Sequence, residues 1–428
     1  MRSPLSLQGT LQAVAEGAFP PAQAVDRCWA RAQHYEPDLQ AFAFLPEAAP
    51  PAGTGPLAGV AVAIKDLIDT ADMPTSYGAA VLRGHRPSAD AAIVQRLRAR
   101  GATVIGKTVT TEFAHQQPGP TRNPWNLDHT PGGSSSGSAA AVAAGIVPLA
   151  FGTQTMGSVI RPAAFCGIVG FKPTFGTIPR DGVHPLCQAL DHVGLFARCV
   201  PDVILAMQLL GFLDPGKIGL GRPLRLAALP LIDATIEPAQ RHVMDSALRL
   251  LRDAGHAVED LALPSGFDDV PAIVDTLLAY EAAGHFGALV SQHGDAISAS
   301  IRGLVMRGQG LGAEDYRAAL AKQTVLREVY ATIAAPYDAV LTIPAAGEAP
   351  HGLAWTGDPR FCAPWSVLGV PALTVPVGFG PSGLPLGLQV VGHWGGDAGL
   401  LQVGARLADL FPPIHPPPAY GQDFGDSM

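Results

Sequence analysis

The sequence has few of the features that mark disulfide-bonded, zinc-binding, nucleic-acid-binding or membrane-spanning proteins. Only five of its 428 residues are cysteines and no two are spaced Cys-x-x-Cys, which argues against a disulfide framework and a zinc site. Charged residues make up 15% of the chain, the formal net charge is −8, and there is no basic stripe of the kind that binds nucleic acid. No apolar run is long enough to span a bilayer, and the N-terminal segment MRSPLSLQGT lacks the apolar region of a signal peptide. We therefore expect a cytoplasmic protein with reduced thiols, no metal, and no nucleic-acid or membrane partner.

Apolar residues and turn formers, by contrast, are abundant. The chain is 48% hydrophobic, enough for a large core, and its 49 glycines and 40 prolines suit many short elements joined by tight turns. Helical and strand patterns alternate: we expect helices at 21–36 and 90–100 and strands at 60–64 and 102–106, with Asp90 as a helix cap and Gly101 after the helix end. This alternation predicts an α/β fold with a sheet covered by helices.

No internal repeat or linker-like composition divides the chain, so a single domain over 1–428 is expected. Within it we distinguish a core of about 55–210, a helix-rich region at 211–335 and C-terminal strands at 336–428 that complete the fold.

One short motif has the form of a phosphate-binding loop. Residues 101–108, GATVIGKT, match the pattern G-x-x-x-x-G-K-[ST], in which a glycine-rich loop follows a strand and precedes a helix. Here a helix is expected before Gly101, and the four residues after it favour a strand. We predict a helix end followed by a strand rather than a nucleotide site that uses Lys107.

A second short motif has the form of a nucleophile turn. Residues 133–137, GSSSG, match G-x-S-x-G, which would make Ser135 the nucleophile of a triad with a later acid and a later histidine. His393 and His415 lie late enough, but neither has an acidic partner or a motif around it. Because an alanine-rich helical segment follows at once, a turn whose serine hydroxyls cap a helix fits better.

A third set of motifs is spread over the chain. It comprises AVAIKDLIDT at 61–70, the glycine- and serine-rich turns PGGSSSGSAAAVAAG at 131–145 and GTQTMGSVIRPAA at 152–164, and GVPALTVPVG at 369–378. In this order they resemble the amidase signature family, and the 24-residue spacing of Ser134 and Ser158 equals that of the family's two catalytic serines. The resemblance implies an amidase that uses no cofactor, with a large mixed twisted β-sheet covered by helices on both sides.

Amide hydrolysis needs an activated nucleophile, a proton for the leaving nitrogen and hydrogen-bond donors for the oxyanion. No histidine is well placed in these segments, so a neutral lysine has to be the base. Lys65, at the end of an expected buried strand, fits because burial disfavours the charged form and lowers the pKa of lysine. Taken alone, Lys65 could equally form an ion pair with Asp66 or lie at the surface.

The resemblance assigns roles to these residues. Ser158 is the nucleophile that forms an acyl-enzyme, Ser134 relays its proton, and Lys65 is the base behind the relay. In the family, the position of Ser134 is associated with a cis peptide bond. The N–H groups of Thr155, Met156, Gly157 and Ser158 are expected to form the oxyanion hole.

The second turn departs from the family pattern T-D-T-G-G-S-I-R-x-P-A. Gln154 replaces the acid, Met156 replaces a glycine, and Arg161 lies one place later than the arginine of the pattern. We expect Met156 to narrow the pocket or close one wall, and Gln154, Gly133 and Ser135 to contribute to substrate binding.

Arg161 lies three residues after Ser158, as in malonamidase-like members, where an arginine so placed pairs with the substrate carboxylate. This favours a small carboxylate-bearing amide, such as a malonamate-like half-amide, cleaved to acid and ammonia. Two alternatives stay open: Arg161 is structural, or the chain resembles the glutaminase subunit of a tRNA-dependent amidotransferase assembly. The oligomeric state, including a homodimer, is left open.

Overall fold

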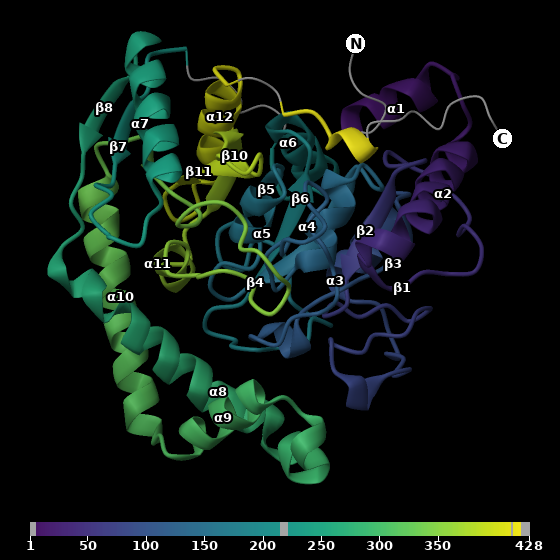
Figure 1. Cartoon of the computed structure of the whole chain (residues 1–428), viewed down its shortest axis with the longest axis horizontal. Coiled ribbons are helices and arrows are strands. Elements are labelled where there is room, and N and C mark those ends of the chain that lie inside the picture. The colour runs from purple at the N-terminus through teal and green to yellow at the C-terminus, as the bar shows by residue number, and fades with distance from the viewer. Residues whose placement is uncertain (1–5, 215–220, 412–413, 421–428) are drawn as a thin grey trace.

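A computed structural model describes residues 6–214, 221–411 and 414–420, and one mixed β-sheet runs through it (Figure 1). The strands are β1 (Phe42–Phe44), β2 (Ala61–Lys65), β3 (Thr103–Thr108), β4 (Leu149–Gln154), β5 (Val169–Lys172), β6 (His192–Ala197), β7 (Arg225–Ala228), β8 (Ala257–Asp260), β9 (Ala339–Thr342), β10 (Ala372–Phe379) and β11 (Pro385–Val391). Their order in the sheet is β1-β3-β2-β4-β6-β5-β10-β11-β9-β7-β8. The runs β3-β2-β4 and β9-β7-β8 are parallel and the other neighbours are antiparallel.

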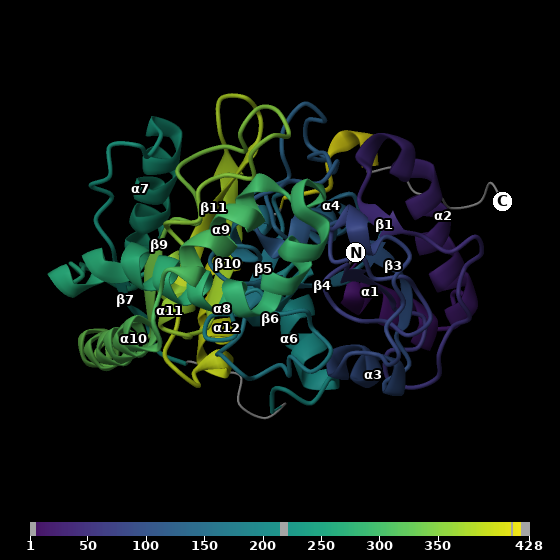
Figure 2. The same cartoon turned by 90° about the horizontal axis from the view of Figure 1, so that it is seen from below.

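Helices cover both faces of this sheet, which confirms the predicted fold class. The helices are α1 (Leu7–Ala15), α2 (Pro21–Leu39), α3 (Ala92–Ala99), α4 (Ser136–Ala143), α5 (Ile160–Phe165), α6 (Val200–Leu209), α7 (Pro238–Asp253), α8 (Val270–His293), α9 (Ala299–Gln309), α10 (Ala313–Ala334), α11 (Ala363–Val367) and α12 (Asp397–Ala408). The apolar cluster on one face includes residues of α3, α6, α7 and α12, and the cluster on the other includes residues of α2, α4 and α5. Helices α8, α9 and α10 extend away from the sheet at the lower left of Figure 1, and Figure 2 shows α8 and α9 together from below.

The alternation of side chains along β2 decides where Lys65 points. All five residues of β2 are buried, as is typical of a central parallel strand. Val62 and Ile64 belong to the cluster with α3 and α6, whereas Ala61 and Ala63 belong to the cluster with α4. Because successive side chains of a strand point to opposite faces, Lys65 lies on the α4 face. The small alanines of that face allow α4 to pack closely.

The predicted helix at 90–100 is α3, and Gly101 follows it with a φ of +89°. The prediction that Asp90 caps this helix is wrong. The residue before α3 is Ala91 and no side chain caps the helix, because the Asp90 carboxylate accepts from Ala71 N at 2.8 Å and pairs with Arg98 at 3.1 Å. Strand β3 follows and contains Lys107, so residues 101–108 form no phosphate loop.

The segment at 133–137 does open a helix, α4, but not with a serine cap. Ser135 precedes the helix without a capping hydrogen bond, since its hydroxyl lies 3.1 Å from Thr153 O and 3.3 Å from Thr153 N. Gly137 allows the close approach of α4 to the sheet: a Cβ there would lie 2.1 Å from Ala41 O. His393, considered as a triad member, bonds instead to Tyr337 O at 2.8 Å.

Among the described residues, no helix is long and apolar enough to cross a bilayer, and no group of three or more His, Cys, Asp or Glu side chains could hold a metal ion. Residues 1–5, at the start of the segment inspected for a signal peptide, lie outside the described residues. The division of the chain into three regions stays a prediction.

Candidate active site

Lys65 and Ser134 meet at the end of β2. The Nζ atom of Lys65 lies 2.7 Å from Ser134 Oγ and 2.8 Å from Thr153 Oγ1, and its side chain is fully buried. Ser134 precedes α4, and the peptide bond between Gly133 and Ser134 is cis, as the family resemblance implied. A strand end and the turn before a helix thus bring an amine and two hydroxyls together on the α4 face.

Burial lowers the pKa of Lys65 well below its ordinary value, and the negative charge of Asp191 partly opposes this shift. The expected alternatives for Lys65, an ion pair with Asp66 or a surface position, do not occur. Asp66 pairs with Lys107 at 3.5 Å. The surroundings of Lys65 therefore favour a neutral amine, which can accept a proton.

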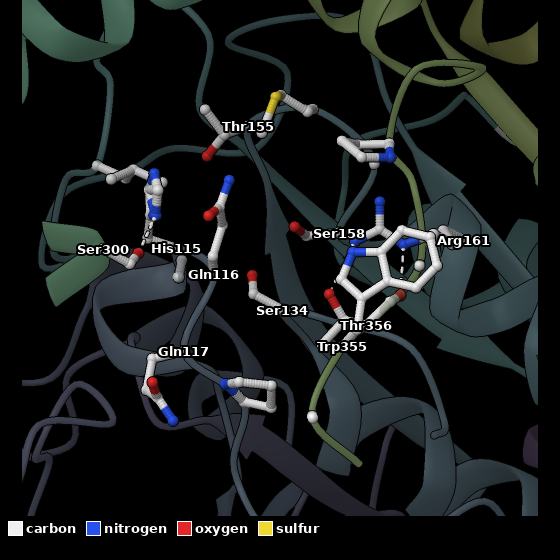
Figure 3. A pocket seen from close by; sticks show the side chains of 18 of the residues that line it. His115, Gln116, Gln117, Ser134, Thr155, Ser158, Arg161, Ser300, Trp355 and Thr356 are labelled. Atoms are coloured by element: carbon white, nitrogen blue, oxygen red, sulfur yellow. Dashed lines mark hydrogen bonds between the residues drawn. The ribbon is translucent and has the colours of Figure 1, made fainter. Parts of the chain in front are cut away.

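Ser134 and Ser158 line the same cavity, which has a volume of about 620 Å³. Figure 3 shows both serine side chains near its centre, with Arg161 and Thr356 on one side and His115 and Ser300 on the other. Ser158 stands before α5 and is 8% exposed. A substrate in this cavity can reach both serine side chains.

The turn that carries Ser158 leaves its amide groups available. The N–H groups of Met156, Gly157 and Ser158 donate to no acceptor among the described residues. Two carbonyl groups of the turn form hydrogen bonds within the protein: Met156 O accepts from Ser366 Oγ at 2.8 Å and Gly157 O accepts from Arg161 N at 3.0 Å. Free donors beside a serine hydroxyl are what an oxyanion hole requires.

Three residues expected to bind substrate lie outside the lining of this cavity. Gln154 is fully buried and caps α5, since its Oε1 accepts from Val159 N at 2.8 Å and Ile160 N at 3.0 Å. Ser135 is bonded to Thr153, as described above, and Gly133 O accepts from Arg161. Their polar groups hold the two turns in place, so we expect no direct substrate contact from them.

Arg161 has both a structural part and a free donor. Its Nε donates to Thr356 O at 2.9 Å and its Nη2 donates to Gly133 O at 2.8 Å. Its Nη1 is buried and has no partner among the described residues, although the side chain lines the cavity. Burial lowers the pKa of Arg161 to about 10, a value that keeps it charged at neutral pH.

Sequence reasoning missed several residues of the site. Thr153 adjoins Gln154 in the second turn and could have been included from that position. Asp191 is buried and accepts from Thr155 Oγ1 at 2.6 Å, and no pattern connects it to the turn. His115 Nδ1 lies 2.8 Å from Ser300 Oγ across 185 residues, and burial lowers the pKa of His115 to about 4, so its ring is neutral.

Two tryptophans and an arginine near residue 360 differ in their position relative to the cavity. Trp355 lines the cavity and is 57% exposed, whereas Trp365 is buried and packs against Tyr330. Arg360 lies at a neighbouring cavity. Only Trp355 contributes to the wall around the serines.

Comparison with known proteins identifies the family of this chain. A family model described as Amidase matches residues 23–401. A glutamyl-tRNA(Gln) amidotransferase subunit from Halothermothrix orenii is 33% identical over 82% of this chain and 85% of its own length. A solved structure of an amidase superposes with a TM-score of 0.86 at 30% identity, covering 95% of this chain and all of that one. The native peptide amidase of Stenotrophomonas maltophilia gives 0.82 at 27%, covering 96% and 98% of the two chains.

These proteins are an amidotransferase subunit and other amidases, so a special closeness to malonamidase-like members is not supported, and the amidotransferase alternative gains support. The expectation that no nucleic acid is a partner is not confirmed either, because the relative belongs to an enzyme named for glutamyl-tRNA(Gln). The family model covers most of the chain, and the two solved structures are those of amidases. The chain belongs to the amidase signature family and is a hydrolase of amide C–N bonds.

Proposed function

We propose that Ser158 is the nucleophile, Ser134 the proton relay and Lys65 the base of this amidase. The observation that carries the proposal is the 2.7 Å contact between the fully buried Lys65 Nζ and Ser134 Oγ, with Ser134 and Ser158 lining the same cavity. A serine hydroxyl is a weak nucleophile unless a base removes its proton. A neutral amine that reaches the cavity through a second hydroxyl provides such a base.

The proposed reaction has two halves. Ser158 Oγ bonds to the carbonyl carbon while its proton passes to Ser134, whose own proton passes to Lys65. The oxyanion receives hydrogen bonds from the N–H groups of the turn at 155–158. The proton then returns through Ser134 to the nitrogen, the C–N bond breaks, and water hydrolyses the acyl-enzyme by the same relay.

Mass spectrometry of the protein after rapid quenching with an amide substrate tests this assignment. We expect the acyl mass on the peptide that contains Ser158, and its absence in Ser158→Ala. An acyl group on Ser135 instead, or full turnover by Ser158→Ala, would refute it.

For the substrate, we propose an amide that carries a carboxylate. The supporting observation is Arg161 Nη1, a buried cationic donor without a partner beside the cavity. Arg161 is the only charged side chain among the described residues that line the cavity. Hydrogen bonds to charged groups contribute about 1.5–3 kcal/mol, which corresponds to roughly 10- to 150-fold in affinity.

Glutamine is the second candidate, and the similarity to amidotransferase subunits supports it. Its α-carboxylate could use the same Arg161 donor, and its side-chain amide would release ammonia. Its ammonium group has no acidic residue to meet among the described residues lining the cavity. Malonamate carries the carboxylate without the ammonium and therefore separates the two candidates.

The test is ammonia release by the purified chain from malonamate, glutamine and propionamide. We expect Arg161→Ala to lower kcat/KM for the carboxylate-bearing amide about 10- to 100-fold more than for propionamide. Equal losses of kcat/KM for the two kinds of amide would mean that Arg161 has only a structural role. A preference for glutamine would favour the amidotransferase alternative, and activity that requires other proteins of such an assembly would favour it further.

A further inference from the structure

A second cavity of about 510 Å³ adjoins the one that contains the serines. The two cavities are neighbours, because four residues line both of them. These shared residues are His115, Gln116, Met156 and Pro359. A ligand that extends from Ser158 past this junction would enter the second cavity.

The wall of the second cavity is largely apolar. Helix α8 contributes Val270, Val274 and Leu278, the turn before it contributes Phe267, and α11 contributes Ala363. Four of the five charged side chains that line this cavity form ion pairs, Arg307 with Asp275 at 3.3 Å and Arg360 with Asp358 at 2.6 Å, and the fifth, Asp268, has no ion pair among the described residues. Paired charges around apolar walls favour an uncharged apolar ligand.

Met156 is the junction residue closest in sequence to the reacting serine, two positions before Ser158. Its side chain is partly buried and packs against the same apolar cluster as α8 and α11. Methionine is unbranched and adapts its shape to neighbouring groups. At a position where the family pattern has glycine, it supplies an adjustable apolar contact between the two cavities.

We propose that the second cavity binds an apolar arm of the amide substrate, and that Met156 contacts this arm where it leaves the serines. The inference rests on the proposed attack by Ser158. In Figure 3 the junction residue His115 lies across the serines from Arg161, so a carboxylate at Arg161 and an apolar arm past His115 can belong to one molecule. The arm is an aliphatic or aromatic group, carried on the acyl or the amine side of the amide.

The length of the alkyl chain of the amide tests the proposed arm site on the unsubstituted protein. Acetamide, butanamide and hexanamide form the acyl-side series, and acetamide, N-butylacetamide and N-hexylacetamide form the amine-side series. We expect kcat/KM to rise by up to about fourfold per added methylene in one of the two series, since each buried methylene contributes about 0.8 kcal/mol. The series that rises identifies the side, and flat or falling values in both would overturn the proposal.

A substitution within the second cavity tests where the arm lies. Ala363→Leu adds apolar bulk to this cavity and none to the first, because Ala363 lines only the second. We expect it to lower the ratio of kcat/KM for the extended amide over acetamide by about fifteenfold, the equivalent of two lost methylenes. Ala272→Leu, on the exposed side of α8 and outside the lining, is the matched control and should keep the ratio. An unchanged ratio in a folded Ala363→Leu protein would also overturn the proposal.

Calorimetry on Ser158→Ala separates this inference from the proposed reaction. If the second cavity binds the arm, the extended amide binds this variant more tightly than acetamide, whichever residue is the nucleophile. Equal binding of the two amides would refute the arm site even if Ser158 proves to be the nucleophile.

Discussion

Two buried lysines on neighbouring strands of this protein point to opposite faces of the sheet and have different partners. Lys65 ends β2 and Lys107 lies in β3, and neither side chain is exposed. In the parallel pairing, Lys107 stands beside Ile64, while Lys65 stands beside Thr108. Paired residues share a face of the sheet, so the two amines point to opposite faces.

Their partners differ as much as their directions. Lys107 Nζ lies 3.5 Å from the buried carboxylate of Asp66 and also bonds to Ile68 O and Thr75 Oγ1. Lys65 has two hydroxyls, Ser134 and Thr153, and no carboxylate within ion-pair distance among the described residues. An ion pair keeps an amine charged, whereas hydroxyls in a buried site leave it free to be neutral.

Burial lowers the pKa of both amines, and that of Lys107 falls to about 8 in spite of Asp66. A third lysine, Lys172, has its pKa lowered by burial to about 7, yet it bonds to the backbone oxygens of Val370 and Pro173 and does not line the serine cavity. A lowered pKa therefore does not identify the base. The hydroxyl chain from Lys65 to the cavity distinguishes it from the other two.

Lys65→Met should have the largest effect on activity. Methionine keeps the length and removes the base, so we expect kcat/KM to fall at least about 10³-fold, within the usual range for general-base catalysis. The measurement is the rate of amide hydrolysis, and unfolding of the variant in denaturant checks that it is folded. Retained turnover would transfer the role of base to another group.

Lys107→Met should have its main effect on stability. It leaves the Asp66 carboxylate buried without its cation, which destabilises proteins by about 3–5 kcal/mol. The free energy of unfolding, measured with urea, should fall by more than in Lys65→Met. In the double variant Lys107→Met/Asp66→Asn we expect part of this loss to be recovered. If Lys107→Met lost activity in the folded protein without losing stability, this would contradict the contrast between the two lysines.

The sequence predicts one side of this contrast better than the other. The alternation in residues 61–65 places a charge at the end of a buried strand, and the two serine turns identify Ser134 and Ser158 by family resemblance. The burial of Lys107 and its pairing with Asp66 could not be predicted, because a shift of register between Val62 and Ala63 decides which face Lys107 occupies. Such a shift depends on the neighbouring strand and leaves no periodic mark in the sequence.

The walls of the site were predicted least well. Gln154, expected to contact substrate, has the geometry of a helix cap, and this depends on how α5 begins. The contact between His115 and Ser300 joins segments 185 residues apart, which spacing alone cannot reveal. The fold class and the residues proposed to react follow local patterns, whereas the shape of the cavity follows long-range packing.

Asp191→Asn should produce a smaller effect that changes with pH. The carboxylate raises the pKa of Lys65, so its removal lowers that pKa further. Because kcat/KM falls as the amine becomes protonated, we expect the acid limb of the pH profile to move to lower pH. The weaker hydrogen bond to Thr155 should also lower kcat about fivefold to tenfold. Asp66→Asn, whose charge faces Lys107, is the control and should leave the acid limb in place.

Ser135→Ala should have the smallest effect, and it separates the two adjacent serines. The hydroxyl of Ser135 bonds to the backbone of Thr153 and does not line the cavity, whereas that of Ser134 contacts Lys65. We expect Ser135→Ala to lower the free energy of unfolding by about 1–3 kcal/mol, since it leaves buried backbone groups without a partner, and to retain most of the activity. Thr153 also carries the hydroxyl that lies 2.8 Å from Lys65 Nζ, so a small displacement of the Thr153 backbone accounts for a modest loss of activity. A loss as large as that of Ser134→Ala, measured on the folded protein, would mean that Ser135 takes part in the reaction and that the G-x-S-x-G interpretation has to be reopened.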